Sequence, residues 1–265
     1  MENSGYMVEF ADVHLSFGTE SVLAGISTGI LRNRTTFIVG RSGCGKSVLT
    51  RLMVGMLLPD RGDVLVKGVK LGTMRESEIR AMRRSLALVP QAPALFDTMD
   101  ILSNIAFPLM AGRLASPGEA VARAHELLDR FDLGSRAQAM PLDLNISDAK
   151  IVSILRSMSL EPECLILDEP TTGLDAVARD AVDGMIGELG RDGRTTIVVV
   201  SHDMQATVAI ADNIVFLYNG GIHLEGSPAE FLAAAGHGDA RDAVDPVLAQ
   251  FISGSPDGPM TMGAF

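Results

Sequence analysis

The sequence predicts an α/β fold, in which a parallel or mixed sheet is flanked by helices. Short β-rich runs alternate with helical patterns along much of the chain. Two of those runs, 164–167 and 195–200, are apolar at nearly every position. Such continuous apolar runs are typical of strands that helices cover on both faces. Ligands of these folds bind at the carboxyl ends of the strands.

Strand and helix patterns divide the chain into a core, an insertion and a tail. The predicted strands are 7–15, 35–39, 85–90, 164–167, 195–200 and 213–217. Helical patterns replace them at 100–111, 117–131 and 148–160, with a typical helix start at Ser116 and Pro117. We therefore expect a core of residues 1–90 and 161–235, with a helical subdomain, residues 91–160, inserted into it. Residues 236–265, with a short helical pattern at 244–251, predict a C-terminal tail that a partner surface orders.

Composition narrows the class of protein. The chain has 265 residues, a net charge of −11 and no tryptophan, which argues against direct binding of nucleic acid. Its two cysteines, Cys44 and Cys164, are too few for a disulfide framework and favour a reducing compartment. No run approaches the roughly 18–20 apolar residues of a spanning helix, and residues 1–10 lack a signal-peptide pattern. We expect contact with a membrane only through a partner.

A glycine-rich loop follows the strand 35–39 and opens a helical pattern. It consists of Gly40, Arg41, Ser42, Gly43, Cys44, Gly45, Lys46, Ser47 and Val48. This pattern is typical of a loop whose backbone N–H groups surround phosphates at a helix N-terminus. Lys46 supplies charge to the β- and γ-phosphates, and Ser47 supplies an oxygen for Mg²⁺. The loop predicts ATP and Mg²⁺ as ligands, and a thiol reagent at Cys44 is expected to block nucleotide binding.

Polar residues follow two other predicted strands. The run 164–167 ends in Asp168 and Glu169, and the run 195–200 is followed by Ser201 and His202. Asp168 is placed to reach the Mg²⁺ bound by Ser47. Glu169 is placed to polarise a water molecule that attacks the γ-phosphate, and His202 to hold that water or the phosphate.

Together these motifs resemble those of ABC-transporter ATPases, over residues 7–223. The resemblance rests on the phosphate loop, Val89-Pro90-Gln91, the run from Asp168 to Asp175, and Ser201-His202. It implies a P-loop NTPase fold of the ABC ATPase type. Gln91 would be the Q-loop glutamine at the Mg²⁺ site, Asp175 the D-loop aspartate and His202 the switch histidine. Phe17 resembles the aromatic residue that stacks on adenine, the alternative being a core phenylalanine.

The signature segment departs from the family pattern Leu-Ser-Gly-Gly-Gln. Aligned without gaps it reads Leu144-Asn145-Ile146-Ser147-Asp148, whereas a shifted alignment that keeps the serine needs a deletion in the next helix. Asn145 and Ser147 would contact ATP on a second subunit. Ile146 places a branched side chain where glycine allows close approach, and Asp148 brings a carboxylate toward phosphates. Both changes predict that this signature contributes weakly to the ATP site it shares with the second subunit. That subunit is either a related ATPase with an intact signature, in a heterodimer, or a second copy of this chain, in a homodimer.

Two further segments are similar to Mla/Mce-type lipid-transport ATPases: residues 94–109 and 250–259. This resemblance implies a membrane permease, an Mce-domain substrate-binding protein, often a STAS-domain protein, and phospholipid or another hydrophobic lipid as cargo. It also implies a peripheral location on the cytoplasmic face of the inner membrane and a tail that packs on the neighbouring ATPase subunit. Alternatives are another importer ATPase, a regulatory ATP-binding subunit, and a permease-free ABC ATPase of DNA repair or translation.

Overall fold

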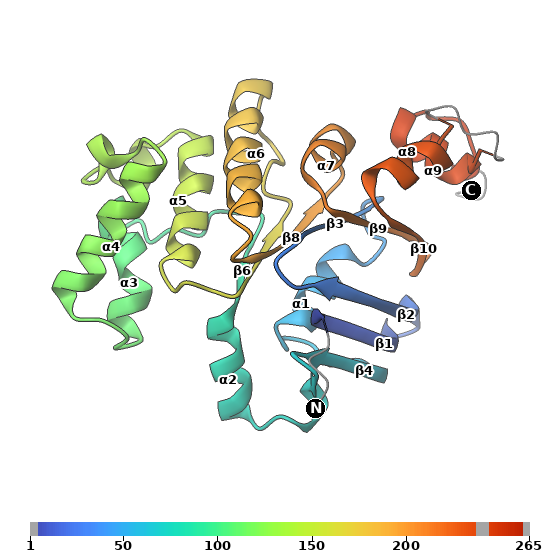
Figure 1. Cartoon of the computed structure of the whole chain (residues 1–265), viewed down its shortest axis with the longest axis horizontal. Coiled ribbons are helices and arrows are strands. Elements are labelled where there is room, and N and C mark those ends of the chain that lie inside the picture. The colour runs from blue at the N-terminus through green and yellow to red at the C-terminus, as the bar shows by residue number, and fades with distance from the viewer. Residues whose placement is uncertain (1–4, 237–243, 262–265) are drawn as a thin grey trace.

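The larger of two sheets carries most of the predicted strands. In the computed structural model, which describes residues 5–236 and 244–261, its order is β10-β9-β3-β8-β7-β6 (Figure 1). The bounds are β10 (Gly221–Gly226), β9 (Asn213–Tyr218), β3 (Thr35–Gly40), β8 (Thr196–Ser201), β7 (Cys164–Asp168) and β6 (Leu86–Val89). All neighbours pair in parallel except β10, which is antiparallel to β9. The prediction of an α/β fold with a parallel or mixed sheet is confirmed, and the sheet is mixed because of β10.

The smaller sheet is antiparallel, and the sequence revealed little of it. Its order is β2 (Glu20–Leu31), β1 (Tyr6–Phe17), β4 (Arg61–Val66) and β5 (Val69–Lys70), and only β1 was predicted. β2 escaped notice because it contains Gly25 and Gly29, residues that weaken strand propensity. A Cβ on Gly29 would lie 2.3 Å from the Tyr6 ring. The glycine is needed for close packing of β2 on β1.

Helices cover the larger sheet on both faces and extend away from it. They are α1 (Lys46–Met53), α2 (Glu76–Ser85), α3 (Ile101–Ala111), α4 (Pro117–Arg130), α5 (Ile146–Met158), α6 (Ala176–Arg191), α7 (Met204–Ile210), α8 (Pro228–Ala234) and α9 (Pro246–Ser253). Three-residue 3₁₀ helices occupy Leu71–Thr73, Gly134–Arg136 and Pro141–Asp143. In Figure 1, α3, α4 and α5 form a separate group beside the sheet. None of the helices within the described ranges is long and apolar enough to cross a membrane.

Alternate residues of the central strands enter two different cores. Phe37 and Val39 of β3 belong to the core shared with α6 and the helical group, whereas Ile38 belongs to the core shared with α1 and the smaller sheet. This alternation follows from the two-residue period of a strand. Because α1 packs beneath β3, the loop between them is held close to the sheet edge.

Helix α5 begins earlier than predicted. The pattern suggested a start at Asp148, but the helix starts at Ile146 and ends at Met158. Asn145 provides the reason, since its side-chain oxygen accepts a hydrogen bond of 2.8 Å from the backbone N–H of Asp148. An asparagine cap of this kind fixes the first turn of a helix.

Buried Asn104 in α3 organises the segment that follows Gln91. It is fully buried, accepts from the N–H of Phe96 at 2.8 Å, and donates to the carbonyls of Phe96, Met99 and Asp100 at 3.0–3.1 Å. Buried polar groups need such partners because an unpaired one costs free energy. Asn104 therefore fixes the path of the chain into α3.

Replacement of Asn104 by leucine is expected to lower the free energy of unfolding by about 2–4 kcal/mol, because several backbone groups lose their partner. The corresponding fall in Tm is roughly 5–12 °C, measured by circular dichroism. The control is leucine at half-buried Asn213, whose side chain donates once, to Glu225, and should cost far less. Equal shifts in the two variants would contradict this account of Asn104.

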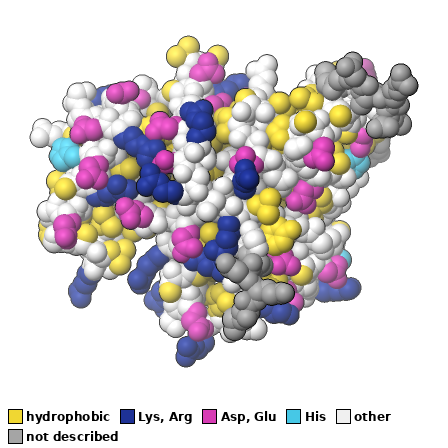
Figure 2. All heavy atoms as spheres, in the orientation of Figure 1, with side chains coloured by type: hydrophobic (Ala, Val, Ile, Leu, Met, Phe, Trp, Pro, Cys, Tyr) yellow, Lys and Arg dark blue, Asp and Glu magenta, His cyan; other side chains and the backbone are white. Residues whose placement is uncertain are grey.

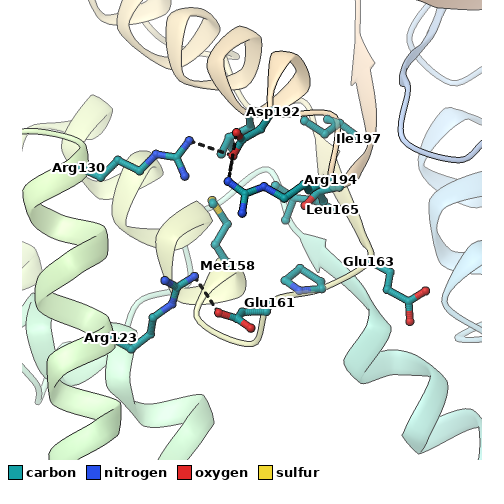
Figure 3. A pocket seen from close by; sticks show the side chains of 12 residues that line it. Arg123, Arg130, Met158, Glu161, Glu163, Leu165, Asp192, Arg194 and Ile197 are labelled. Atoms are coloured by element: carbon teal, nitrogen blue, oxygen red, sulfur yellow. Dashed lines mark hydrogen bonds and ion pairs between the residues drawn. The ribbon is translucent and has the colours of Figure 1, made fainter.

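Ion pairs connect the helical group to the core around a cavity of about 390 Å³ (Figure 3). Arg130 of α4 contacts Glu188 at 2.8 Å and Asp192 at 3.4 Å, and Arg194 also contacts Asp192. Arg123 of α4 contacts Glu161 at 3.2 Å. In Figure 3 the guanidinium groups of Arg123 and Arg130 reach carboxylates on other elements, whereas Arg194 pairs with Asp192 on its own turn. These contacts fix the angle of α4 relative to α6 without forming a free anion site.

The tail folds on its own chain, at least over 244–261. Phe251 of α9 lies against Phe216 of β9 with ring centroids 4.8 Å apart, and Leu248 is fully buried. The side-chain oxygen of Gln250 accepts from the N–H of Met260 at 2.7 Å, and Arg41 of the glycine-rich loop donates to the Met260 carbonyl. The expectation that only a partner surface orders this segment was wrong, because its apolar side chains reach the core of the same subunit. Residues 237–243 and 262–265 lie outside the described part.

Acidic and basic side chains are interspersed over the face shown in Figure 2. Lys and Arg groups there stand beside Asp and Glu groups along the helices, consistent with the ion pairs of α4 and α6.

Candidate active site

The predicted functional residues gather at one edge of the larger sheet. β3, β8, β7 and β6 run in parallel, so their carboxyl ends share an edge. The glycine-rich loop follows β3, Asp168 and Glu169 end β7, His202 follows β8, and Gln91 follows β6. β8 lies between β3 and β7, which places His202 beside both the loop and Glu169. Loops at this edge are the expected place for a ligand.

The glycine-rich loop is held against the sheet by close backbone contacts. Gly40 and Gly45 have φ angles of 154° and 104°, and a Cβ on Gly40 would lie 2.5 Å from the Leu217 carbonyl oxygen. Lys46 is only 6% exposed, and its Nζ donates to the carbonyls of Gly40 at 2.8 Å and Arg41 at 3.0 Å. The loop therefore folds around its own lysine, with α1 beginning at that residue.

Ser47 and Asp168 converge from opposite sides of the site. The Ser47 hydroxyl donates to Asp168 Oδ1 at 3.1 Å, joining α1 to the end of β7. Burial raises the pKa of the Asp168 carboxyl, and the hydrogen bond from Ser47 acts in the opposite direction. A hydroxyl beside a carboxylate is a set of oxygen donors that suits Mg²⁺. Within the described residues no group of three or more His, Cys, Asp or Glu side chains forms a complete metal site, so phosphate oxygens or water would have to complete the coordination.

Glu169 has a strained backbone and three polar neighbours. Its φ angle of 52° lies in the left-handed region, a conformation that non-glycine residues adopt mainly at special sites. Oε2 accepts from the Thr172 hydroxyl at 2.8 Å and lies 2.7 Å from His202 Nδ1, while Oε1 lies 3.8 Å from Lys46 Nζ. The carboxylate is thus aimed at the space above the glycine-rich loop.

These groups surround a cavity of about 460 Å³, a size suited to a small ligand. Its lining residues are Phe17, Val22, Ser42, Gly43, Gly45, Lys46, Ser47, Val48, Gln91, Glu169, Thr172 and His202. Phe17 is 50% exposed, so it is not the core phenylalanine that the sequence left as an alternative. Together with Val22 it forms an apolar wall at one end of the cavity.

Sequence patterns missed two residues that shape this site. Thr172 binds the carboxylate of Glu169, and buried Lys150 of α5 donates to the carbonyls of Thr172 at 2.8 Å and Glu169 at 3.4 Å. Lys150 therefore supports the turn that carries Glu169. The run from Asp168 to Asp175 contained Thr172, but nothing in the sequence spacing indicated the contact from Lys150.

Three predicted residues lie away from the cavity. The Asn145 amide donates to the Asp148 carboxylate at 3.0 Å, and the Ser147 hydroxyl is turned toward the Ala178 carbonyl. Asp175 caps α6 through a 2.9 Å bond from the N–H of Ala178. Ser147 is buried, so the polar groups of the signature segment contact partners within their own chain.

The predicted effect of Asp148 needs correction. Its carboxylate pairs with Arg136, whose other guanidinium nitrogen donates to the Asp143 carbonyl at 2.8 Å. An internal ion pair neutralises the negative charge that was expected to repel phosphates. The branched side chain of Ile146, 54% exposed, remains as the obstacle to close approach.

Cys44 also differs from expectation. Its sulfur packs beside Gly40 and the core that contains α1, and Cys44 is not among the residues that line the cavity. Burial raises the pKa of the Cys44 thiol and raises that of fully buried Cys164 to about 12. Both thiols are consequently poor nucleophiles near neutral pH.

In the folded protein we expect 5,5′-dithiobis(2-nitrobenzoic acid) at pH 7.5 to leave both cysteines unmodified over minutes. Addition of guanidinium chloride should release two equivalents of reactive thiol. Rapid modification of one thiol in the native protein, slowed by ATP, would restore the original prediction for Cys44.

Comparison with known proteins decides the family. A sequence profile described as ABC transporter matches residues 23–172, more than half of the chain. The chain belongs to the ABC transporter family. It is an ABC ATPase, in which ATP hydrolysis is coupled to transport, and ATPases of this family dimerise and pair with permease subunits.

Relatives of this ABC ATPase include ATP-binding proteins of phospholipid transport and of methionine import. It is 31% identical to protein TRIGALACTOSYLDIACYLGLYCEROL 3 of Arabidopsis thaliana, over 98% of this chain and 77% of the relative. The intermembrane phospholipid transport system ATP-binding protein MlaF of Escherichia coli is 31% identical, over 96% of this chain and 91% of the relative. The methionine import ATP-binding protein MetN of Rhizobium johnstonii is 33% identical, over 83% of this chain but 60% of the relative.

Solved ABC structures share the fold. CbiO1 from Clostridium perfringens, part of the transporter complex cbiONQ, has a TM-score of 0.79 at 27% identity and covers 87% of this chain and 92% of its own. A dimeric, post-hydrolysis form of the ATP-binding cassette MJ0796 with ADP and Pi has a TM-score of 0.74 at 26% identity. It covers 84% of this chain and 99% of its own.

Proposed function

We propose that this ABC ATPase drives transport of phospholipid or another hydrophobic lipid across the bacterial envelope. The main support for this proposal is the share of the chain that aligns with each relative. MlaF aligns with 96% of this chain, which includes most of the tail, whereas MetN aligns with 83%. The proposed partners are a membrane permease, an Mce-domain substrate-binding protein and a STAS-domain protein. The chain would then sit peripherally on the cytoplasmic face of the inner membrane, and its tail would also contact the neighbouring ATPase subunit.

The proposed reaction uses the groups around the 460 Å³ cavity. Phe17 would stack on adenine, and the loop from Gly40 to Val48 would surround the phosphates with N–H groups. Lys46 would leave the carbonyls of its own loop and bind the β- and γ-phosphates. Glu169 would take the proton of the attacking water, and His202 would hold the γ-phosphate or that water in line.

Three residues fit a divalent cation at the same site. Ser47, Asp168 and Gln91 would hold Mg²⁺, which supplies positive charge to the phosphates when bound. Gln91 also begins the segment that Asn104 and Arg156 fix, Arg156 by donating to the Ala94 carbonyl at 2.8 Å. A movement of Gln91 when Mg²⁺ and ATP bind would therefore shift α3, where we place the permease contact.

The signature face supports an asymmetric pair of subunits. Asn145, Ser147 and Asp148 all bind within their own chain, and Ile146 projects where glycine is usual. We propose that this face is the weak half-site and that a related subunit with an intact signature completes the efficient one. Replacement of Ile146 by glycine should then raise turnover in the assembled complex. Unchanged or lower turnover, with one ATPase polypeptide present, would support a symmetric dimer instead.

The cargo class can be tested on the complex purified in detergent from native membranes through a tag on this chain. Mass spectrometry should find a permease, an Mce-domain protein and bound phospholipid, and added phospholipid should stimulate ATP hydrolysis. Copurification of an amino-acid-binding protein, with stimulation by methionine and none by lipid, would overturn the lipid assignment.

A further inference from the structure

An ion pair joins the starts of α6 and α7 behind the active site. Nη1 of Arg179 donates to Oδ2 of Asp203 at 3.0 Å. Arg179 lies one turn beyond Asp175, the residue that caps α6, and its backbone N–H donates to the Asp175 carbonyl at 2.9 Å. Asp203 directly follows His202. The pair thus connects the segment that carries the D-loop aspartate to the segment that carries the switch histidine.

Asp203 is fixed by a complete set of hydrogen bonds. Its Oδ1 accepts from the N–H groups of Gln205 at 2.9 Å and Ala206 at 3.3 Å. Its own N–H donates to the Ser201 hydroxyl at 3.0 Å, and its side chain is 15% exposed. His202 therefore stands between the end of β8 and a rigid aspartate. The backbone position of His202 depends on where Asp203 is held.

Arg179 provides positive charge next to a group of carboxylates. Asp180 and Asp183 lie on the same helix, and Asp203 faces them from α7. The pKa of Asp183 is raised to about 6, first by burial and then by the charge of Asp203, while Arg179 opposes this shift. Without Arg179, Asp203 would lose the cation it pairs with and would still face Asp183.

Cavities lie on two sides of the ion pair. A cavity of about 390 Å³ between the D-loop, the His202 segment and the end of α9 is lined by both Arg179 and Asp203. A second, of about 430 Å³ between α6 and α7, is lined by the same two residues. The ion pair therefore adds a polar link to the apolar contact that α6 and α7 make elsewhere, as at Gly187 and Ile210.

We propose that Arg179 is a positioning residue for ATP hydrolysis: through Asp203 it holds His202 in the orientation that meets Glu169. The His202 side chain is 59% exposed and its Nδ1 lies 2.7 Å from Glu169 Oε2, so few other contacts restrain it. This proposal rests on the role given to His202 in the proposed function. It adds a residue whose effect on hydrolysis passes through Asp203 and His202.

The test is a double-mutant cycle in the ATPase assay of the assembled complex. Arg179→Met should lower kcat about tenfold and leave KM for ATP within twofold of wild type. Since Arg179 acts through His202, adding Arg179→Met to His202→Ala should cause no further loss. A further loss by the same factor in the double variant would overturn the proposal, because Arg179 would then act independently of His202.

Two further variants of the ion pair and one control test whether its charge is what matters. Arg179→Lys, which retains a positive charge, should recover at least half of the wild-type kcat, and failure to recover would count against a charge-based role. Should Arg179→Met not fold, Asp203→Asn removes the other charge of the pair, keeps an oxygen for the α7 cap and enters the same cycle. Arg84→Met, at an exposed position of α2, is the control and should leave kcat unchanged.

The same assay distinguishes a wrong role for His202 in the proposed function from a wrong role for Arg179 alone. Normal turnover by His202→Ala would remove His202 from the mechanism and overturn both proposals. Losses that multiply in the double variant, with His202→Ala strongly impaired, would overturn only the role of Arg179.

Discussion

Glu169→Gln is expected to lower ATP hydrolysis about 10²–10⁴-fold, the range typical for loss of a positioned general base. Glutamine keeps the shape of the side chain and can still accept the hydrogen bond from Thr172. It cannot take a proton from water. The affinity for ATP should change little, because Oε1 of Glu169 lies 3.8 Å from Lys46 and supports binding only indirectly.

Steady-state turnover and equilibrium binding of ATP separate the two effects. The matched control is Glu163→Gln, a glutamate just before β7 that pairs with Lys67 at the surface, and it should leave turnover unchanged. Normal turnover in Glu169→Gln would show that another group activates the water.

Replacement of Lys46 by methionine is expected to raise the Kd for ATP about 100-fold, equivalent to about 2.7 kcal/mol. Methionine fills similar space but lacks the charge that the phosphates require. Lys46 is almost fully buried in the loop, so no neighbouring cation can take its place without rebuilding the site.

Isothermal titration calorimetry measures this loss directly. Lys67→Met serves as the control, because Lys67 is a lysine paired with Glu163 far from the cavity, and its Kd should match wild type. The melting temperature shows whether the Lys46 variant is folded. A folded Lys46→Met protein that binds ATP within threefold of wild type would exclude the assigned role of this lysine.

Much of the site was predictable because its residues follow strands in sequence. Parallel pairing of β3, β8, β7 and β6 brings loops far apart in the chain to one edge, and each loop contains a recognisable polar residue. Both the α/β class and the group around Glu169 follow from this regularity.

Other features depend on contacts that no local pattern records. Lys150 supports Glu169 from α5, and Arg179 of α6 contacts Asp203 at the start of α7, so neither could be found from spacing. The charge of Asp148 was misjudged because its partner Arg136 lies on the preceding loop. The orientation of the Cys44 thiol was missed for a similar reason, since it depends on close packing beside Gly40.

The packing of the tail on its own subunit could not be predicted from its short apolar pattern. A short helix with glycine- and proline-rich flanks suggested a segment without its own core. In the structure the Phe251 ring packs at a tilt against Phe216, and the Met260 carbonyl accepts a hydrogen bond from Arg41 of the phosphate loop. Both partners are more than thirty residues away, a distance at which sequence periodicity gives no information.

The central claim is that this chain hydrolyses ATP through Glu169 at the edge of its parallel sheet to drive transport. The most direct measurement is the ATPase rate of the complex purified from native membranes, with wild-type or Glu169→Gln chain and every polypeptide identified by mass spectrometry. The account predicts steady hydrolysis by the wild-type complex, its loss in the Glu169→Gln complex, and a permease in both. Equal rates in the two complexes, or a chain that copurifies with no permease, would contradict it.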